Sequence, residues 1–511
     1  MTRRRRFRIV TQALQGSMMV SAWIGLPFAL LVAGAAAAQT ASPQQTPLTY
    51  AEASVRLRTS SSLSRAAGYG VDAASEQAAA AAGLRRPTVS LDAQAIRYRK
   101  TFDISLTGAL DKAQSELGAA IPGLISDLPG IPGDILQTVG QRLQAALPEI
   151  FAALPTDVRL EVEDTAFRPT LTALQPIYSG GAIPALQRAA AANVDMAQAR
   201  RREAMDLEGV NLARAYFGQV LAAEAVRIST DTRDGFDLHL RNAERMEREG
   251  VLSHAQTLQV QVARDASQRQ LDRAQLEYDN SVQSLGRVLN LDDGVTPTTP
   301  LFVNRASVGP MDVFIAQASQ SNARIAQAQA TRDLAEAGVD LAESRFRPTV
   351  YAFGTYNLNP DNALPTEPDW AVGIGARYTL MSSIDRRRMA GAARSQAQAA
   401  GELERQARDD ARLLVTRAYN QAELARRQFL SMDSSLTAAT ENLRVQEIGF
   451  REGESPVSAV VDARNLLGAA RLQRAVAAYE YDLSLAALLA ASSSPQTLND
   501  YLQRDDRISA P

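Results

Sequence analysis

The chain has 511 residues, more than the roughly 250 to 300 over which one compact core keeps growing, so it predicts several packed units or an elongated architecture. Hydrophobic residues make up 46% of the sequence but aromatic residues only 5%, which favours closely packed long helices over a sandwich or doubly wound sheet. There is no cysteine and there are only two histidines, which excludes disulfides, thiolate metal sites and lipidation through cysteine, and leaves little for acid–base chemistry.

The first 38 residues are expected to be an export signal. They carry five arginines, no acidic residue, an apolar stretch over about 18–32 and a small-residue ending at 36–38. Cleavage there would change the net charge from −2 to −7 by removing the five arginines, and an acidic mature chain disfavours nucleic-acid binding. Arg4, Arg5 and Phe7 leave twin-arginine export open, but no downstream cofactor site requires it, so we favour ordinary secretion.

Two copies of one pattern make up the rest of the chain. Residues 177–290 align with 380–493 without a gap, at an offset of 203. The matches include the Ala-Tyr pairs at 215–216 and 418–419 and the Arg-Glu-Gly sequences that end at Gly250 and Gly453. We therefore predict a tandem duplication, with a first repeat over 39–308, including a linker over 291–308, a second over 309–493, and a tail over 494–511.

Each repeat predicts a long helix, a short break and a second helix. Between 183 and 249 no proline follows Pro184, and apolar residues keep the alternating spacing of three and four that is typical of a packed helix. A span of 67 residues corresponds to roughly 100 Å of helix. Gly250 and Gly453, the second followed by Pro456, are residues that end one helix and start the next. Each helix pair is thus expected to be a hairpin with a tip.

Strand-like segments precede each helix pair. In 370–380, apolar residues alternate with small or polar ones from Trp370 to Leu380, which is the pattern of a membrane barrel strand. Its expected partner is 349–357, and the first repeat offers 88–98 and 167–177. No later stretch has 18 uncharged apolar residues, so entry into a membrane would require a closed barrel. The expected aromatic girdle of this barrel is Phe167, Tyr351, Phe353, Trp370 and Tyr378.

The first strand pair contains an insertion. The Arg-Pro-Thr-Val sequence at 86–89 recurs at 347–350 with an offset of 261 instead of 203, which leaves additional residues at about 100–158. Asp127 and Asp134 interrupt its apolar sequence, so we do not expect a membrane span there. We expect an ordered loop at the outer end of the barrel, which either modifies the outer mouth or is simply tolerated.

The order of these elements resembles the TolC-like outer-membrane efflux protein family, the outer membrane factors. The resemblance covers nearly the whole mature chain and is carried by the export signal, the strand entries at 86–89 and 347–350, the Ile-Tyr-Ser-Gly-Gly sequence at 177–181, and the two tips. It implies a mixed α/β, mostly α-helical membrane protein. Four strands per chain would form a trimeric 12-stranded β-barrel, continued by a long α-helical barrel in the periplasm. Four strands alone would leave open edges in lipid.

The family implies an exit duct in the Gram-negative outer membrane that is not an enzyme and needs no cofactor. Such a duct passively conducts substrates in efflux or type I secretion, as a homotrimer in outer-membrane lipid, with a periplasmic adaptor and an inner-membrane RND or ABC transporter. A soluble periplasmic coiled-coil adaptor or scaffold is the alternative, and a periplasmic hydrolase is a third. The strand pattern after Trp370 disfavours the scaffold, and the lack of convergent polar groups disfavours the hydrolase.

The family also implies functional residues at the periplasmic end. Aligned on Gly453, Asp462 falls on an inner ring of pore carboxylates; otherwise it is a solvated acid on the outer face. Three further gate positions hold Gln256, Ser455 and Ala459 in place of the family's charged residues, so its usual ionic latch is expected to be absent or rebuilt. The tip residues, expected to contact the adaptor or else to serve only as helix stops, are Gly250, Val251, Leu252, Ser253, Gly453, Glu454 and Ser455.

Two further features concern surface charge and metal binding. Arg386, Arg387 and Arg388 follow the last strand, where they either meet anionic headgroups or form a solvated run of charge. His239 and His254 lie at unrelated helical phases, which disfavours a metal site.

Overall fold

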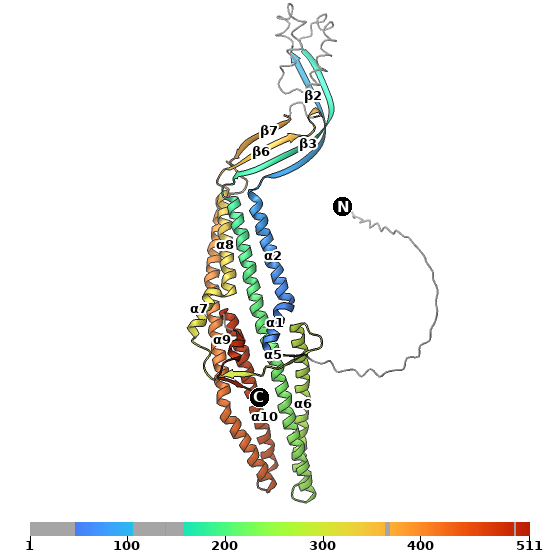
Figure 1. The fold of residues 1–511 in the computed structure, drawn as a ribbon, viewed down its shortest axis with the longest axis vertical. Coiled ribbons are helices and arrows are strands. Elements are labelled where there is room, and N and C mark those ends of the chain that lie inside the picture. The colour runs from blue at the N-terminus through green and yellow to red at the C-terminus, as the bar shows by residue number, and fades with distance from the viewer. Residues whose placement is uncertain (1–45, 106–137, 139–156, 363–367, 495–496, 511) are drawn as a thin grey trace, which may run out of the picture. The chain divides into compact units, whose positions relative to one another are not determined.

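The computed structural model describes residues 46–105, 138, 157–362, 368–494 and 497–510 (Figure 1). The expected export signal at 1–38 and most of the insertion at 100–158 lie outside these residues. The described part is mostly helical, as the sequence predicts. In chain order its main elements are β1 (Thr46–Leu48), α1 (Tyr50–Ser60), α2 (Ser62–Ala82), β2 (Thr88–Ser105), β3 (Asp157–Tyr178), α5 (Ala182–Arg248), α6 (His254–Leu289), β4 (Val295–Pro297), β5 (Phe302–Asn304), α7 (Met311–Ser321), α8 (Ala323–Ser344), β6 (Thr349–Asn357), β7 (Trp370–Arg377), α9 (Arg386–Arg451), α10 (Val457–Ser492), α11 (Leu498–Leu502) and β8 (Arg507–Ser509).

Four strands form one antiparallel sheet in the order β2-β3-β6-β7. The strands lie where the sequence indicates, but β2 continues to Ser105 and β3 already begins at Asp157. β7 ends at Arg377, so Leu380 follows the strand instead of belonging to it. Within the described residues β2 and β7 pair with one strand each, which leaves two open edges.

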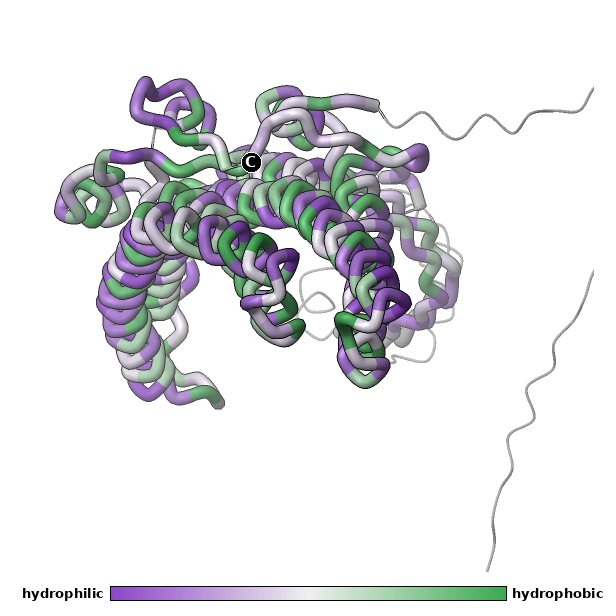
Figure 2. The backbone as a smooth tube through the Cα atoms, turned by 90° about the horizontal axis from the view of Figure 1, so that it is seen from below, coloured by the Kyte–Doolittle hydropathy of each residue, from purple (hydrophilic) through white to green (hydrophobic). Residues whose placement is uncertain are grey.

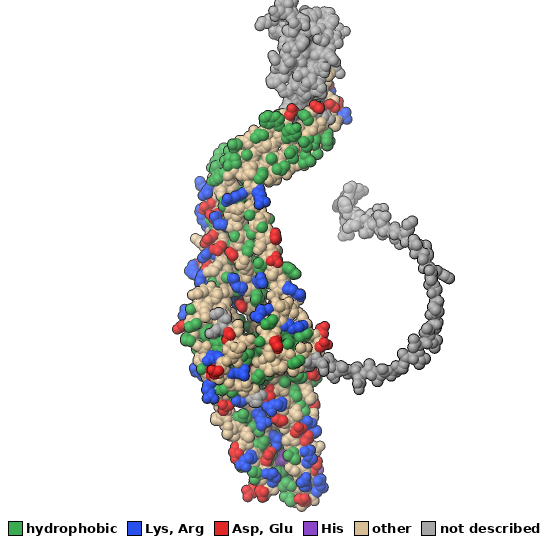
Figure 3. Space-filling view, in the orientation of Figure 1, with side chains coloured by type: hydrophobic (Ala, Val, Ile, Leu, Met, Phe, Trp, Pro, Cys, Tyr) green, Lys and Arg blue, Asp and Glu red, His purple; other side chains and the backbone are tan. Residues whose placement is uncertain are grey.

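One face of this sheet exposes large apolar side chains. Trp370, Val372 and Ile374 alternate along β7 and are 65%, 76% and 74% exposed. The strand register places more exposed apolar side chains on the same face, namely Tyr356, Leu171, Phe167, Leu91 and Val89. Figure 3 shows hydrophobic side chains gathered over the strands, above helices with mixed charge. A soluble sheet would bury such a face against another layer.

The long helices have the predicted extent. α5 has 67 residues and α9 has 66, and each turns back into a helix of 36 residues, α6 or α10. α2 packs on α5, and α8 packs on both α5 and α9. Seen from below, these helices lie side by side in a curved layer (Figure 2). None of the helices in the described ranges is both long enough and apolar enough to cross a membrane.

The largest core lies where the short strands cross the helices. Tyr216 on α5 is fully buried there; its hydroxyl donates to the Leu48 carbonyl at 2.7 Å and accepts from the amides of Thr298 and Thr299 at 3.0 and 2.9 Å. Tyr419, 203 positions later, likewise donates to the Gly309 carbonyl at 3.0 Å. The two Ala-Tyr pairs therefore have matching structural roles: each tyrosine ties a connecting segment to a long helix.

Candidate pore and gate at the helical tips

The first tip joins α5 to α6. Gly250 has a φ of +76°, a left-handed conformation that glycine adopts without strain, and it ends α5. The amides of Val251 and Leu252 then donate to the Met246 carbonyl at 2.9 and 3.2 Å, which closes the turn. Val251 is 62% exposed, whereas Leu252 packs against the core between the hairpins. The exposed surface of this tip therefore includes the Val251 side chain.

Ser253 starts α6 with a capping box. Its amide and hydroxyl both donate to Oε1 of Gln256, at 3.0 and 2.7 Å. At Gln256 the resemblance implies a gate acid in other members of the family, and here the glutamine side chain caps the helix. Beside it, Glu247 pairs with His254 at 2.8 Å, and the nearby polar side chains of Thr257 and His254 lower the pKa of Glu247. This tip is therefore stabilised by local hydrogen bonds.

The second tip joins α9 to α10 and has the same backbone turn. Gly453 has a φ of +79°, and the amides of Glu454 and Ser455 donate to the Gly449 carbonyl at 2.8 and 3.0 Å. A Cβ at Gly449 would lie 2.4 Å from Oγ of Ser455, so this position also needs glycine. Pro456 precedes the first turn of α10. Glu454 is exposed at the tip.

Asp462 lies in the second turn of α10. Its side chain is exposed, and no hydrogen bond or ion pair holds it within the described residues. Ala459, one turn earlier, is half-buried and carries no charge. A carboxylate held by no partner is free to interact with mobile ions.

Arg464, two residues further along α10, joins three helices. Its guanidinium forms an ion pair with Glu447 of α9 and lies 5.8 Å from the centre of the Phe236 ring on α5. It also occupies the space beside Gly235 of α5, where an added Cβ would come within 1.5 Å of Nη1. The side chain is only 14% exposed. No sequence pattern points to Arg464 itself, although a glycine inside a long helix, such as Gly235, is a signal of close approach.

Other contacts join the two hairpins along α5 and α10. Arg471 of α10 pairs with Asp231 of α5 at 3.5 Å, and a Cβ at Gly468 would lie 3.1 Å from Oγ1 of Thr232. Further down, the buried His239 ring of α5 packs edge-on against Phe450 of α9, with 4.6 Å between ring centres. These contacts join the first hairpin to both helices of the second, α10 at Gly468 and Arg471 and α9 at Phe450.

His239 is an uncharged part of this boundary. Burial, together with the nearby charge of Arg464, lowers its pKa from 6.5 to about 4. Its Nε2 atom has no hydrogen-bond partner in the part of the chain that is described. The described residues also contain no group of three or more His, Cys, Asp or Glu side chains that could hold a metal ion.

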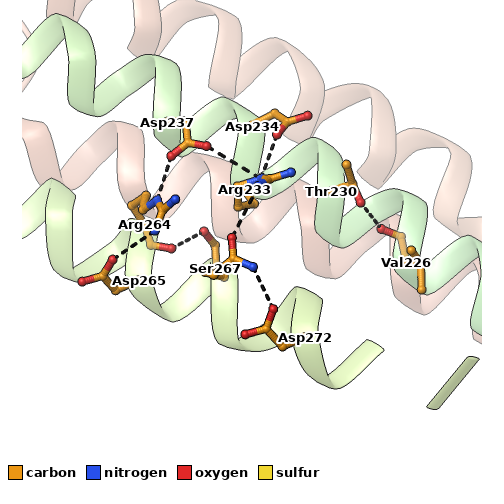
Figure 4. A network of polar contacts seen from close by, with 10 residues as sticks. Val226, Thr230, Arg233, Asp234, Asp237, Arg264, Asp265, Ser267 and Asp272 are labelled. Atoms are coloured by element: carbon orange, nitrogen blue, oxygen red, sulfur yellow. Dashed lines mark hydrogen bonds and ion pairs between the residues drawn. The ribbon is translucent and has the colours of Figure 1, made fainter. Parts of the chain in front are cut away.

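A polar network fastens the two helices of the first hairpin together (Figure 4). Arg264 of α6 pairs with Asp237 of α5 at 2.7 Å, and Arg233 of α5 donates to Gln268 of α6 at 3.4 Å. Gln268 in turn donates to Asp272 at 2.7 Å. Because these groups cross between α5 and α6, the hairpin is tied into one unit.

The five residues of the expected girdle do not share one face. Tyr351 and Phe353 lie directly opposite Gly375 and Gly373 in the register, and their rings cover these glycines; a Cβ would come within 2.6 and 3.0 Å of the rings. Directly opposed residues share a face, so these two rings lie on the side away from Trp370. This corrects the expectation of one girdle. Phe167 and Trp370 remain on the exposed apolar face, and Tyr378, 54% exposed, follows the end of β7.

The chain matches a known protein family over more than half of its length. The family described as outer membrane efflux protein matches residues 161–291 and 314–493, more than half of the chain. Protein CyaE of Bordetella pertussis is 25% identical over 261 residues, or 49% of this chain and 54% of that protein. The chain thus matches about half the length of this curated relative.

Three solved structures have the same fold. CusC has a TM-score of 0.68 at 14% identity, over 88% of this chain and 92% of CusC. The outer membrane channel CmeC of Campylobacter jejuni has a TM-score of 0.67 at 13% identity, over 89% and 88%. The outer membrane protein VceC of Vibrio cholerae has a TM-score of 0.66 at 12% identity, over 87% and 95%.

Proposed function

The chain belongs to the outer membrane efflux protein family, and from this premise we propose that it is the exit duct of a tripartite efflux or type I secretion system. In this role it passively conducts substrates delivered by an inner-membrane transporter across the periplasm and the outer membrane. A periplasmic adaptor would contact the two tips. The duct makes and breaks no bond, so its selectivity depends on its pore and on its partners.

This proposal rests on one observation: a sheet with open edges and an exposed apolar face is joined to two long helical hairpins. The sheet has four strands and two free edges within the described residues, and its exposed face carries Trp370, Val372 and Ile374. In lipid there is no water to form hydrogen bonds with the backbone N–H and C=O groups of such edges, so the sheet must close by pairing with other copies. Three copies supply twelve strands, a size found among outer-membrane barrels. A soluble coiled-coil scaffold does not account for this face.

The gate of this duct is proposed to use the boundary between the hairpins. Arg464 joins α10 to Gly235 and Phe236 of α5 and thereby holds the second hairpin against the first. Because Gln256 caps a helix and Ala459 is uncharged, this contact takes the place of an ionic latch at those positions. Asp462 is proposed to line the pore mouth, where three copies would attract cations.

Fractionation and electrical recording test the function. The mature protein should sediment with outer membranes, run as a trimer in mild detergent and conduct ions in planar bilayers. Recovery of a soluble monomer from a periplasmic extract, without detergent, would contradict the proposal. A trimer that inserts but never conducts, even after Arg464→Ala, would argue for a structural role instead of a duct.

A further inference from the structure

Seven arginines surround the junction between the strands and the helices, and we call them the arginine collar. They come from three separate segments: the end of the turn before β2, the connection from α8 to β6, and the first turn of α9. Figure 3 shows basic side chains directly below the apolar side chains of the strands. The collar consists of Arg85, Arg86, Arg345, Arg347, Arg386, Arg387 and Arg388.

Most of this charge is not neutralised by the chain itself. Asp385 caps α9 by accepting from the amides of Arg387 and Arg388 at 2.9 and 3.2 Å, and it pairs with the Arg388 side chain at 3.4 Å. For the other six collar arginines, no carboxylate lies within ion-pair distance among the described residues. Like charges gathered in this way repel one another unless an external anion lies between them.

Arg386 has a structural role within the collar. Its guanidinium donates to the carbonyls of Arg345 and Leu380 at 2.9 and 3.3 Å and lies 5.4 Å over the Phe346 ring. It therefore fixes the loop that follows β7 to the end of α8. Arg85, Arg86 and Arg387 make no such side-chain contacts in the described part of the chain and remain exposed.

Exposed apolar side chains lie immediately beside the collar. Leu380, Met381 and Ile384, which precede the α9 arginines, are 84%, 91% and 54% exposed. Apolar side chains exposed to this degree next to unpaired arginines match the boundary between acyl chains and lipid phosphates.

The opposite end of the sheet is different. There Arg97 pairs with Glu163 at 2.9 Å, and Arg99 pairs with Glu161, so the arginines are neutralised within the sheet. Among the described arginines of the collar and of this opposite end, those without an ion-pair partner lie at the end that joins the helices. This asymmetry indicates that the two ends meet chemically different surroundings.

We infer that the arginine collar binds the phosphate groups of anionic phospholipids, with the chemistry of phosphatidylglycerol, in the leaflet that faces the periplasm. Arginine presents two parallel N–H donors to a phosphate, and several arginines around one ring of headgroups act together. This inference rests on the proposed function, because it requires the sheet to lie in the outer membrane with its helices in the periplasm.

The test measures which lipids the full-length mature protein retains. The protein is reconstituted in vesicles of equal phosphatidylglycerol and phosphatidylethanolamine and extracted in mild detergent, and the lipid that remains bound is quantified by mass spectrometry. We expect phosphatidylglycerol to be enriched about fivefold in the wild type, and this enrichment to fall when salt is raised. In the triple variant Arg85→Gln, Arg86→Gln, Arg387→Gln it should fall to about the bulk ratio.

Two control variants test whether the position of the charge and the arginine side chain itself matter. Arg200→Gln, Arg201→Gln, Arg427→Gln removes the same charge from exposed helical positions, outside the collar, and should retain the enrichment. Replacing Arg85, Arg86 and Arg387 by lysine should give an enrichment between those of the wild type and the glutamine variant, because the charge is kept but the paired N–H donors are lost. Wild-type protein without enrichment, or equal loss in the collar and helical variants, would overturn the inference.

Membrane fractionation separates this inference from the proposed function. If the wild type does not reach the outer membrane, the proposed function itself fails. If it reaches the outer membrane and conducts ions but shows no lipid preference, only the collar inference fails. Trimer formation by the triple glutamine variant confirms that its lipid result does not arise from misfolding.

Discussion

The guanidinium of Arg464 on α10 fills the space that a side chain at Gly235 on α5 would occupy; an added Cβ would lie 1.5 Å from Nη1 and 2.2 Å from Cζ. The guanidinium is the far end of a flexible side chain, so it can move away when a side chain at Gly235 fills that space. The absence of a side chain at Gly235 thus makes room for Arg464, which joins the two hairpins. Substitution of Gly235 tests this contact without removing a charge.

Gly235→Ala is expected to displace Arg464 from Phe236 and to loosen the hairpin boundary. A cation–π contact contributes about 0.5 to 2 kcal/mol, and about 1.4 kcal/mol corresponds to a tenfold change in the open fraction. Open probability in planar-bilayer recordings should therefore rise severalfold. Gly209→Ala on the same helix is the control, because nothing lies within 4 Å of its added Cβ. Equal open probability in both variants would show that the contact does not gate the pore.

Asp462→Asn tests the pore assignment. If three copies of this exposed carboxylate line the mouth, removing the charge should weaken both cation preference and block by multivalent cations from the periplasmic side. Asp409→Asn is the control, since Asp409 is exposed on α9 roughly 60 Å of helix from the tip. Wild-type selectivity and block in Asp462→Asn would place the residue on the outer, solvated face.

His239 should make the hairpin boundary sensitive to acid. Its pKa is lowered from 6.5 to about 4, so between these values the unfolded chain binds a proton that the folded chain does not. Stability is thus retained above pH 6.5 and falls as the pH is lowered toward 4, by at most about 1.4 kcal/mol per pH unit. His239→Gln should reduce the loss of thermal stability between pH 7 and 5, measured by differential scanning calorimetry. An equal loss of stability in His239→Gln and in the wild type would contradict this prediction.

Asp482 in the central core should make stability depend on pH in the opposite direction. The carboxyl is fully buried, one oxygen accepts only from the Phe302 amide at 3.3 Å, and burial raises its pKa well above the usual range. The unfolded chain releases this proton near pH 4 while the folded chain retains it, so stability falls as the pH rises above 4. Asp482→Asn should therefore melt progressively higher than the wild type between pH 5 and 8. Asp279→Asn, at the exposed position 203 residues earlier, should show no such gain.

The long helices, their tips and the alternating strands could be read from the sequence because each depends on neighbouring residues. The pattern predicts a helix over 183–249, and α5 spans Ala182–Arg248; glycine at 250 and 453 adopts the left-handed turn on which that prediction depends. Likewise, the alternation from Trp370 to Ile374 predicts an apolar face, and these side chains are exposed together. Periods of 3.6 and 2.0 residues and the conformational freedom of glycine are local properties, and the sequence records them directly.

Contacts between distant segments were decided only by the tertiary structure. Tyr351 and Phe353 have the same local alternation as Trp370, yet the register with Gly375 and Gly373 puts them on the other face. Asp279 and Asp482 are equivalent in the sequence pattern, but the segment containing Phe302 covers only Asp482, which is therefore buried and has a raised pKa. Arg464 and Gly235 have no pattern in common. Register and helix packing depend on which surfaces meet, and this follows from the whole chain because close packing couples residues that are far apart in sequence.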